Sequence, residues 1–162
     1  MAAMPLFRAI QDSALGSTIS TSTWMFPTIE TLHVVALSIV LGSIVVVDLR
    51  LVGLASKERS ITALTHDFLP WTWGAFALAA VTGTLLFTSR AADYMAITPF
   101  ITKFVFMALA GANMIYFHFA TQRSIKDWDT GEPAAAGKFA GAVSLILWAA
   151  IVICGRQVGF KL

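Results

Sequence analysis

Four long apolar stretches of the chain contain no Asp, Glu, Lys or Arg, and short polar segments separate them. The stretches are residues 31–47, 68–89, 104–122 and 139–155. Each approaches the roughly 20 apolar residues with which an α-helix crosses about 30 Å of hydrocarbon. The pattern therefore predicts four membrane-spanning helices.

Prolines and short linkers indicate where these helices begin and end. A proline stands near the start of each span: Pro27, Pro70, Pro99 and Pro133. Proline suits a first helical turn because its missing N–H would have no partner there. The predicted helices cover about 27–54, 69–90, 99–123 and 134–157. Because short linkers make successive helices antiparallel, we expect an all-α, up-down-up-down four-helix bundle. Both termini then lie at one end, here called side A, and the first and third loops lie at the other, side B.

Residues 1–25 do not have the pattern of a cleaved signal peptide. They carry one basic residue, Arg8, and end in the polar run 17–23 rather than in an apolar core with a small-residue cleavage site. Leu6 and Ile10 fall on one helical face, opposite Arg8. We expect a short interfacial helix that lies on the membrane, with a disordered tail as the alternative.

The composition excludes most classes of soluble protein. The chain is 57% hydrophobic and 12% charged, whereas a soluble domain carries about a quarter charged residues. The mean hydropathy of +0.78 agrees with a single membrane domain over residues 1–162, whose main partner is the lipid bilayer. A net charge of +2, without a polybasic patch, predicts no nucleic-acid partner. The single cysteine, Cys154, excludes a disulfide within the chain.

The distribution of basic residues predicts which end of the protein faces the cytoplasm. Side B is expected to hold Arg50, Lys57, Arg59, Arg123, Lys126 and Lys138, and side A to hold Arg8, Arg90, Arg156 and Lys161. Cytoplasmic loops carry the excess of Lys and Arg. We therefore expect side B to be cytoplasmic and both termini to be periplasmic.

Polar residues inside the spans are candidates for function, because ionisable groups in a membrane are costly and usually face the protein interior. The expected side A cluster is Glu30, His33, Lys103 and Arg156, and the expected side B cluster is Asp48, Arg50, Asn113 and His118, with His66 as a further candidate. Glu30 and His33 are three residues apart on one helical face, where a carboxylate can orient an imidazole. The alternatives are a pair that satisfies itself at the interface and basic side chains that extend to the head groups.

The histidines raise the question of haem b, whose iron accepts one or two imidazoles. At a rise of about 1.5 Å per residue, His33 lies roughly 12 Å from the middle of its helix toward side A, and His118 roughly 12 Å from the middle of its helix toward side B. They are therefore possible ligands of haem iron, but not of the same iron. Each could bind its own haem, or His118 could pair with His66.

The order of motifs resembles a family of uncharacterised bacterial four-helix inner-membrane proteins. The residues that carry the resemblance are Ile29-Glu30-Thr31-Leu32-His33, Gly42, Asp48-Leu49-Arg50-Leu51, Leu69-Pro70-Trp71-Thr72-Trp73, Thr82-Gly83, Lys103, Asn113, His118 and Gly155-Arg156. The resemblance extends from Trp24 over nearly all of the remaining chain. It implies a four-helix architecture and a bacterial cytoplasmic membrane, and it assigns no activity.

Three functions fit these observations. The first is an electron-transfer subunit that holds haem b or a quinone near His33 and His118, with Glu30, Arg50, Lys103 and Arg156 at propionate or quinone oxygens. The second is a non-catalytic accessory subunit of a larger membrane complex or homo-oligomer, in which buried charges pair to fix helix register. The third is a small transporter or metal-handling protein. No motif of a soluble enzyme is present, so we do not expect an enzyme on its own.

Overall fold

A computed structural model describes residues 4–121 and 125–161, and every regular element among them is helical. Four helices are long: α3 (Met25–Val52), α4 (Ile61–Ser89), α6 (Thr98–Tyr116) and α8 (Ala135–Gly159). The shorter ones are α1 (Met4–Gln11), α2 (Ala14–Thr21), α5 (Ala91–Ala96) and α7 (Ile125–Trp128), and a π-helical segment, η1 (Phe117–Thr121), continues α6. The prediction of an all-helical protein is confirmed for this part of the chain.

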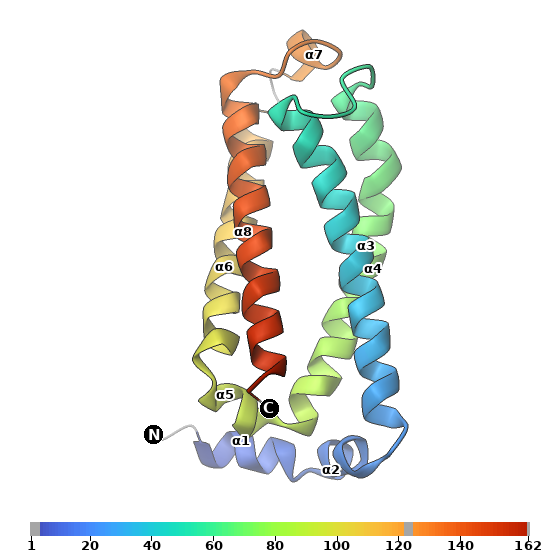
Figure 1. Cartoon of the computed structure of the whole chain (residues 1–162), viewed down its shortest axis with the longest axis vertical. Helices are drawn as coiled ribbons and strands as arrows, with labels where there is room; N and C mark the ends of the chain where they lie inside the picture. The colour runs from blue at the N-terminus through green and yellow to red at the C-terminus, as the bar shows by residue number, and fades with distance from the viewer. Residues whose placement is uncertain (1–3, 122–124, 162) are drawn as a thin grey trace.

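The four long helices lie side by side (Figure 1). The short helices α1, α2 and α5 and the C-terminus lie at one end, which is side A, and α7 lies at the other end, side B. Helix α3 packs on α4 and on α8, and α6 packs on α8. The connections between successive long helices alternate between the two ends (Figure 1).

The outer surfaces of the long helices are apolar. In each span, at most 22% of the most apolar window is buried inside the protein. Most of its apolar side chains therefore point outward, as Val35, Val81, Val105 and Ile146 do. Water would disfavour so large an apolar surface, whereas lipid tails accept it. The chain is a multi-pass membrane protein, as the charge-free stretches predicted.

The second span begins earlier than predicted. Helix α4 starts at Ile61 rather than near residue 69, and Pro70 lies inside it. The Ser60 side chain caps the helix, and the Asp129 carboxylate accepts the Thr62 N–H at 2.8 Å. Proline removes one hydrogen bond from a helix interior, but these caps hold the turns that precede it.

The third span changes its geometry near side B. Helix α6 carries Pro99 in its first turn, as predicted, and its α-helical part ends at Tyr116, where η1 begins. The predicted end of this helix at residue 123, and the cation Arg123, lie outside the described residues. A π-helical turn contains one more residue per hydrogen bond than an α-helical one and is often found at functional sites.

The N-terminal segment forms two helices rather than one. Ser13 ends the first and caps the second through the Gly16 N–H. Both helices pack against the rest of side A: Gln11 accepts a hydrogen bond from the Ala92 N–H at 3.0 Å, and Ile19 is fully buried. Helices α1 and α2 therefore cover part of side A.

Small residues let the long helices approach one another closely. Ala36, Ala75 and Ala79 are buried in α3 and α4, and the Thr72 hydroxyl donates to Ser43 across this seam at 2.7 Å. Gly141 of α8 contacts α3 so closely that an added Cβ would lie 2.9 Å from Leu51 Cβ. Close packing of this kind replaces the hydrophobic effect between helices in lipid.

Candidate functional site

The His33 ring is held between α3 and α4 by Thr82. Its Nδ1 lies 2.9 Å from the Thr82 hydroxyl oxygen, and that hydroxyl lies 2.7 Å from the Leu78 carbonyl. The Ala79 carbonyl of the same helix also hydrogen-bonds to the ring. Two groups of α4, the Thr82 hydroxyl and the Ala79 carbonyl, therefore hold the imidazole in place.

Gly83 provides the surface on which this ring lies. A Cβ added there would approach His33 Cε1 to 2.9 Å, closer than a real side chain allows. The glycine is therefore required for the position of the imidazole, and the Thr82-Gly83 pair supplies both the hydrogen bond and the space.

Lys103 and Glu30 stand near the ring without a bond to it. The charges of both residues act on His33. The Lys103 ammonium lies 4.7 Å from the Phe100 ring centroid and 5.4 Å from that of Phe104, and no carboxylate of the described residues forms an ion pair with it. Glu30 is exposed, so the group that orients the ring is Thr82 and not the carboxylate that the sequence suggested.

Tyr94 of α5 also lies at side A, and the sequence did not single it out. Its ring stacks on Phe100 with the centroids 5.0 Å apart. Burial raises the pKa of the Tyr94 phenol above its usual range, against the opposing charge of Arg90 and with a further contribution from Glu30. The sequence contained no signal for this residue, because a lone tyrosine in a short linker is compatible with many roles.

Arg156 is not brought to His33. Its guanidinium carbon lies 4.4 Å from the centre of the Phe160 ring, and the residue is exposed. We define the side A cluster by its observed members, which are Glu30, His33, Thr82, Tyr94 and Lys103.

The buried Arg50 guanidinium bonds to backbone carbonyls at side B. It is 1% exposed, its Nε donates to the Arg59 carbonyl at 2.8 Å, and its Nη2 donates to the carbonyls of Asp129 and Gly131 at 3.2 and 3.0 Å. One guanidinium thus ties the end of α3 to the loops before α4 and before α8. The sequence indicated a buried cation and could not indicate these backbone partners.

Asp48 lies two residues before Arg50 on α3 and is 6% exposed. The Ser144 hydroxyl of α8 hydrogen-bonds to its carboxyl group, while the buried Oδ2 has no hydrogen-bond partner among the described residues. Buried polar atoms are almost always satisfied, so Asp48 is a polar group whose bonding the described residues leave incomplete.

The remaining polar residues of side B have separate surroundings. The Asn113 side chain donates to the Ala140 carbonyl at 2.9 Å and joins α6 to α8. His118 lies in η1 and is exposed, and the side chain of His66 is 90% exposed. No described hydrogen bond or ion pair links Asp48, Arg50, Asn113 and His118 to one another, so they do not form the single cluster that the sequence suggested.

The histidines do not face a common iron. His33 contacts Thr82, which lies about 24 Å from His66 along α4 at a rise of about 1.5 Å per residue. His118 lies in η1, which follows the side B end of α6, whereas His33 lies in the first three turns of α3, near side A. Among the described residues, no group of three or more His, Cys, Asp or Glu side chains could hold a metal ion. A haem in one chain would therefore take one imidazole from this chain.

The chain matches no protein-family model, no curated protein and no solved structure.

Proposed function

We propose that this membrane protein is a small electron-transfer subunit in which His33 contacts a redox cofactor at side A. The observation that carries the proposal is the anchoring of the partly buried His33 ring, inside a membrane span, by Thr82 and Ala79 of α4. Imidazoles that ligate metals are commonly oriented in this way, through a hydrogen bond from their other ring nitrogen.

Haem b is the cofactor that we favour. The His33 imidazole would ligate the iron, and the Lys103 ammonium is a suitable partner for a propionate because no described carboxylate neutralises it. A quinone is the alternative: a quinol hydroxyl could donate to the imidazole, and Lys103 or Tyr94 could donate to a quinone oxygen. Both ligands require the same ring position.

We propose the following placement in the membrane. The protein is an up-down-up-down bundle of a bacterial cytoplasmic membrane, which is the location that the family resemblance implies. Side B with Lys57, Arg59 and Lys138 would be cytoplasmic, and α1 and α2 would lie at the periplasmic interface. Labelling of single cysteines placed in the loop before α4 and in α1 tests this orientation.

A second function is supported by a different observation. The partners of Arg50 and Asn113 are backbone carbonyls of this same chain, which supports a role in fixing loops and helix register. Such polar contacts are expected in an accessory subunit of a larger membrane complex or in a homo-oligomer. In that case the polar residues would affect assembly and not cofactor content.

A spectrum of the detergent-purified protein tests the first proposal. We expect a reduced-minus-oxidised haem band in the wild type, its loss in His33→Ala, and its retention in His66→Ala, the matched control at an exposed histidine. If porphyrin is absent, extraction for quinone follows, with the same variants. Neither cofactor in the wild type, or equal content in His33→Ala, would sink the electron-transfer proposal. Equal content together with loss of a co-purified partner in Asn113→Ala would support the accessory subunit.

A further inference from the structure

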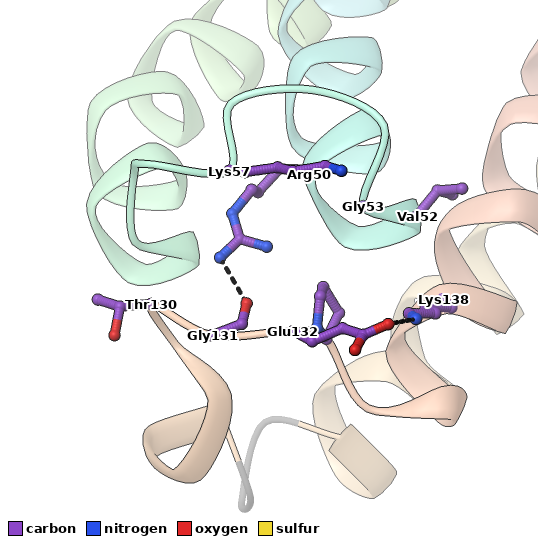
Figure 2. A pocket seen from close by; sticks show the side chains of 9 residues that line it. Arg50, Val52, Gly53, Lys57, Thr130, Gly131, Glu132 and Lys138 are labelled. Carbon is purple, nitrogen blue, oxygen red and sulfur yellow. Dashed lines mark hydrogen bonds and ion pairs between the residues drawn. The ribbon is translucent and has the colours of Figure 1, made fainter.

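A pocket of about 360 Å³ lies at side B, at a distance from the side A cluster. Figure 2 shows one wall formed by the end of α3 and the loop that follows it, and the facing wall formed by the loop before α8. Its lining contains three cationic side chains, Arg50, Lys57 and Lys138, and one carboxylate, Glu132. The pocket therefore has an excess of positive charge.

Arg50, one of the residues that line this pocket, is buried and forms no ion pair with a described carboxylate. Arg50 is 1% exposed, and its three hydrogen bonds are made by Nε and Nη2 to uncharged carbonyls, one of them on Gly131 as Figure 2 shows. Its Nη1 donates to no described group, and no described carboxylate forms an ion pair with it. Burial of an unpaired charge is costly, so an anion in the pocket would stabilise this arrangement.

The other charges of the pocket add to the positive potential. The Lys138 ammonium bonds to the Glu132 carboxylate, and this contact, with a smaller contribution from Lys57, holds the pKa of the exposed Glu132 below its usual range. The adjacent N-terminus of α8 has no side-chain cap and no acidic residue in its first turn. The positive end of this helix dipole adds to the potential of the pocket, and Glu132 is the carboxylate among the lining residues that opposes it.

We propose that this pocket binds a phosphate group, and that an anionic phospholipid presents it. Arg50 is in the last turn of α3 and Lys138 in the first turn of α8, so both lie at the depth where the spans end and lipid head groups begin. A guanidinium and two ammonium groups are the side chains that recognise phosphate oxygens most strongly. Free phosphate would satisfy the same groups, and the test separates the two sources.

Thermal unfolding of the full chain in a neutral detergent provides the test. The unfolding midpoint is measured with added phosphatidylglycerol, with phosphatidylcholine and with inorganic phosphate. We expect phosphatidylglycerol to raise the midpoint more than phosphatidylcholine, whose choline repels the pocket cations. An equal rise with inorganic phosphate would identify the free anion as the ligand, whereas a rise with lipid alone would identify the head group.

Two variants assign the effect to the pocket. Lys57→Gln removes an exposed cation, so it is not expected to disturb the fold, and we expect it to weaken phosphatidylglycerol binding several-fold. Lys161→Gln, at side A, makes the same charge change and should leave binding unchanged. The proposal is overturned if neither phosphate source raises the wild-type midpoint, or if both variants reduce binding equally.

Discussion

His33 of α3 and Thr82 of α4 form a hydrogen bond of 2.9 Å between Nδ1 and the threonine hydroxyl, and this bond joins two spans. The same hydroxyl lies 2.7 Å from the Leu78 carbonyl of its own helix. A residue without charge therefore orients the histidine of the side A cluster.

Replacement of this hydroxyl tests its control of the ring. Thr82→Val keeps the shape and removes the hydroxyl, so we expect a destabilisation of about 0.6 kcal/mol, the average for hydrogen bonds between helices in a membrane. If His33 ligates a cofactor, loss of its orienting partner should weaken binding by about 10- to 100-fold. Unfolding in mixed micelles and cofactor titration measure the two effects. Thr84→Val is the control, since the exposed Thr84 hydroxyl bonds only within its own helix to Ala80. An equal effect of the two variants would show that the hydroxyl of Thr82 has no special role.

Glycine substitutions in α4 should separate ring displacement from a general effect on the helix. Gly83→Ala places a methyl group 2.9 Å from His33 Cε1, and we expect it to cost about 1–3 kcal/mol, as overpacking usually does. Gly74→Ala, in the same helix, meets no atom within 4 Å and should be neutral or slightly stabilising. The unfolding midpoints of the two variants give the comparison. Similar values would contradict the close contact between Gly83 and the ring.

Arg50→Lys should destabilise side B strongly. The single ammonium nitrogen of lysine cannot reach the carbonyls of Arg59, Asp129 and Gly131 together, whereas the guanidinium uses two nitrogens. We expect the free energy of unfolding to fall by about 2–4 kcal/mol because charged hydrogen bonds are lost. Protease cleavage in the loop before α4 should also become faster. Both changes are measured on the same preparation.

Arg59→Lys is the matched control for this change. The Arg59 side chain forms an exposed ion pair of 2.7 Å with Asp67, and such pairs contribute about 0–1 kcal/mol. Its carbonyl, which Arg50 uses, is unaffected by the substitution. If Arg59→Lys were as damaging as Arg50→Lys, the buried guanidinium would not be the main tie between the loops.

We expect the stability of the protein to fall at alkaline pH because of Tyr94. Burial raises its pKa in the folded state above the unfolded value, so the folded state retains the phenol proton longer. The corresponding stability is fully present below the unfolded pKa of about 10 and is lost as the pH rises through the higher folded pKa. The difference in tyrosinate absorbance between the wild type and Tyr94→Phe isolates this group from the second tyrosine. A Tyr94 titration at or below the ordinary value would contradict its burial against Phe100.

The positions of the spans were predictable because lipid demands long apolar helices, but the start of α4 was not. Residues 61–69 contain Thr62, Thr65, His66 and Asp67, which are more typical of a loop than of a membrane helix. They are helical because the neighbouring Ser60 caps the start of the helix, and so does Asp129, which is distant along the chain. The first cap could have been found from Ser60 itself, whereas the second depends on tertiary structure.

The candidate site was predictable only in part for a similar reason. Ionisable residues in spans stand out by their cost, so His33, Asp48 and Arg50 were found. Thr82 stood out only as part of a motif of the family resemblance and not as a site residue, because a threonine that bonds within its own helix and one that also orients a histidine look alike in sequence. Arg50 was found for its charge, but its partners are carbonyls, which every residue possesses.

The cap that Asp129 places on Thr62 has a consequence for how the protein is made. The two residues are 67 positions apart, so the first pair of spans is synthesised before the residue that completes the start of its second helix. Two of the three carbonyls that Arg50 bonds to, those of Asp129 and Gly131, are also synthesised after the first two spans. The side B end of the first two spans therefore gains these hydrogen bonds only after the third loop has been synthesised.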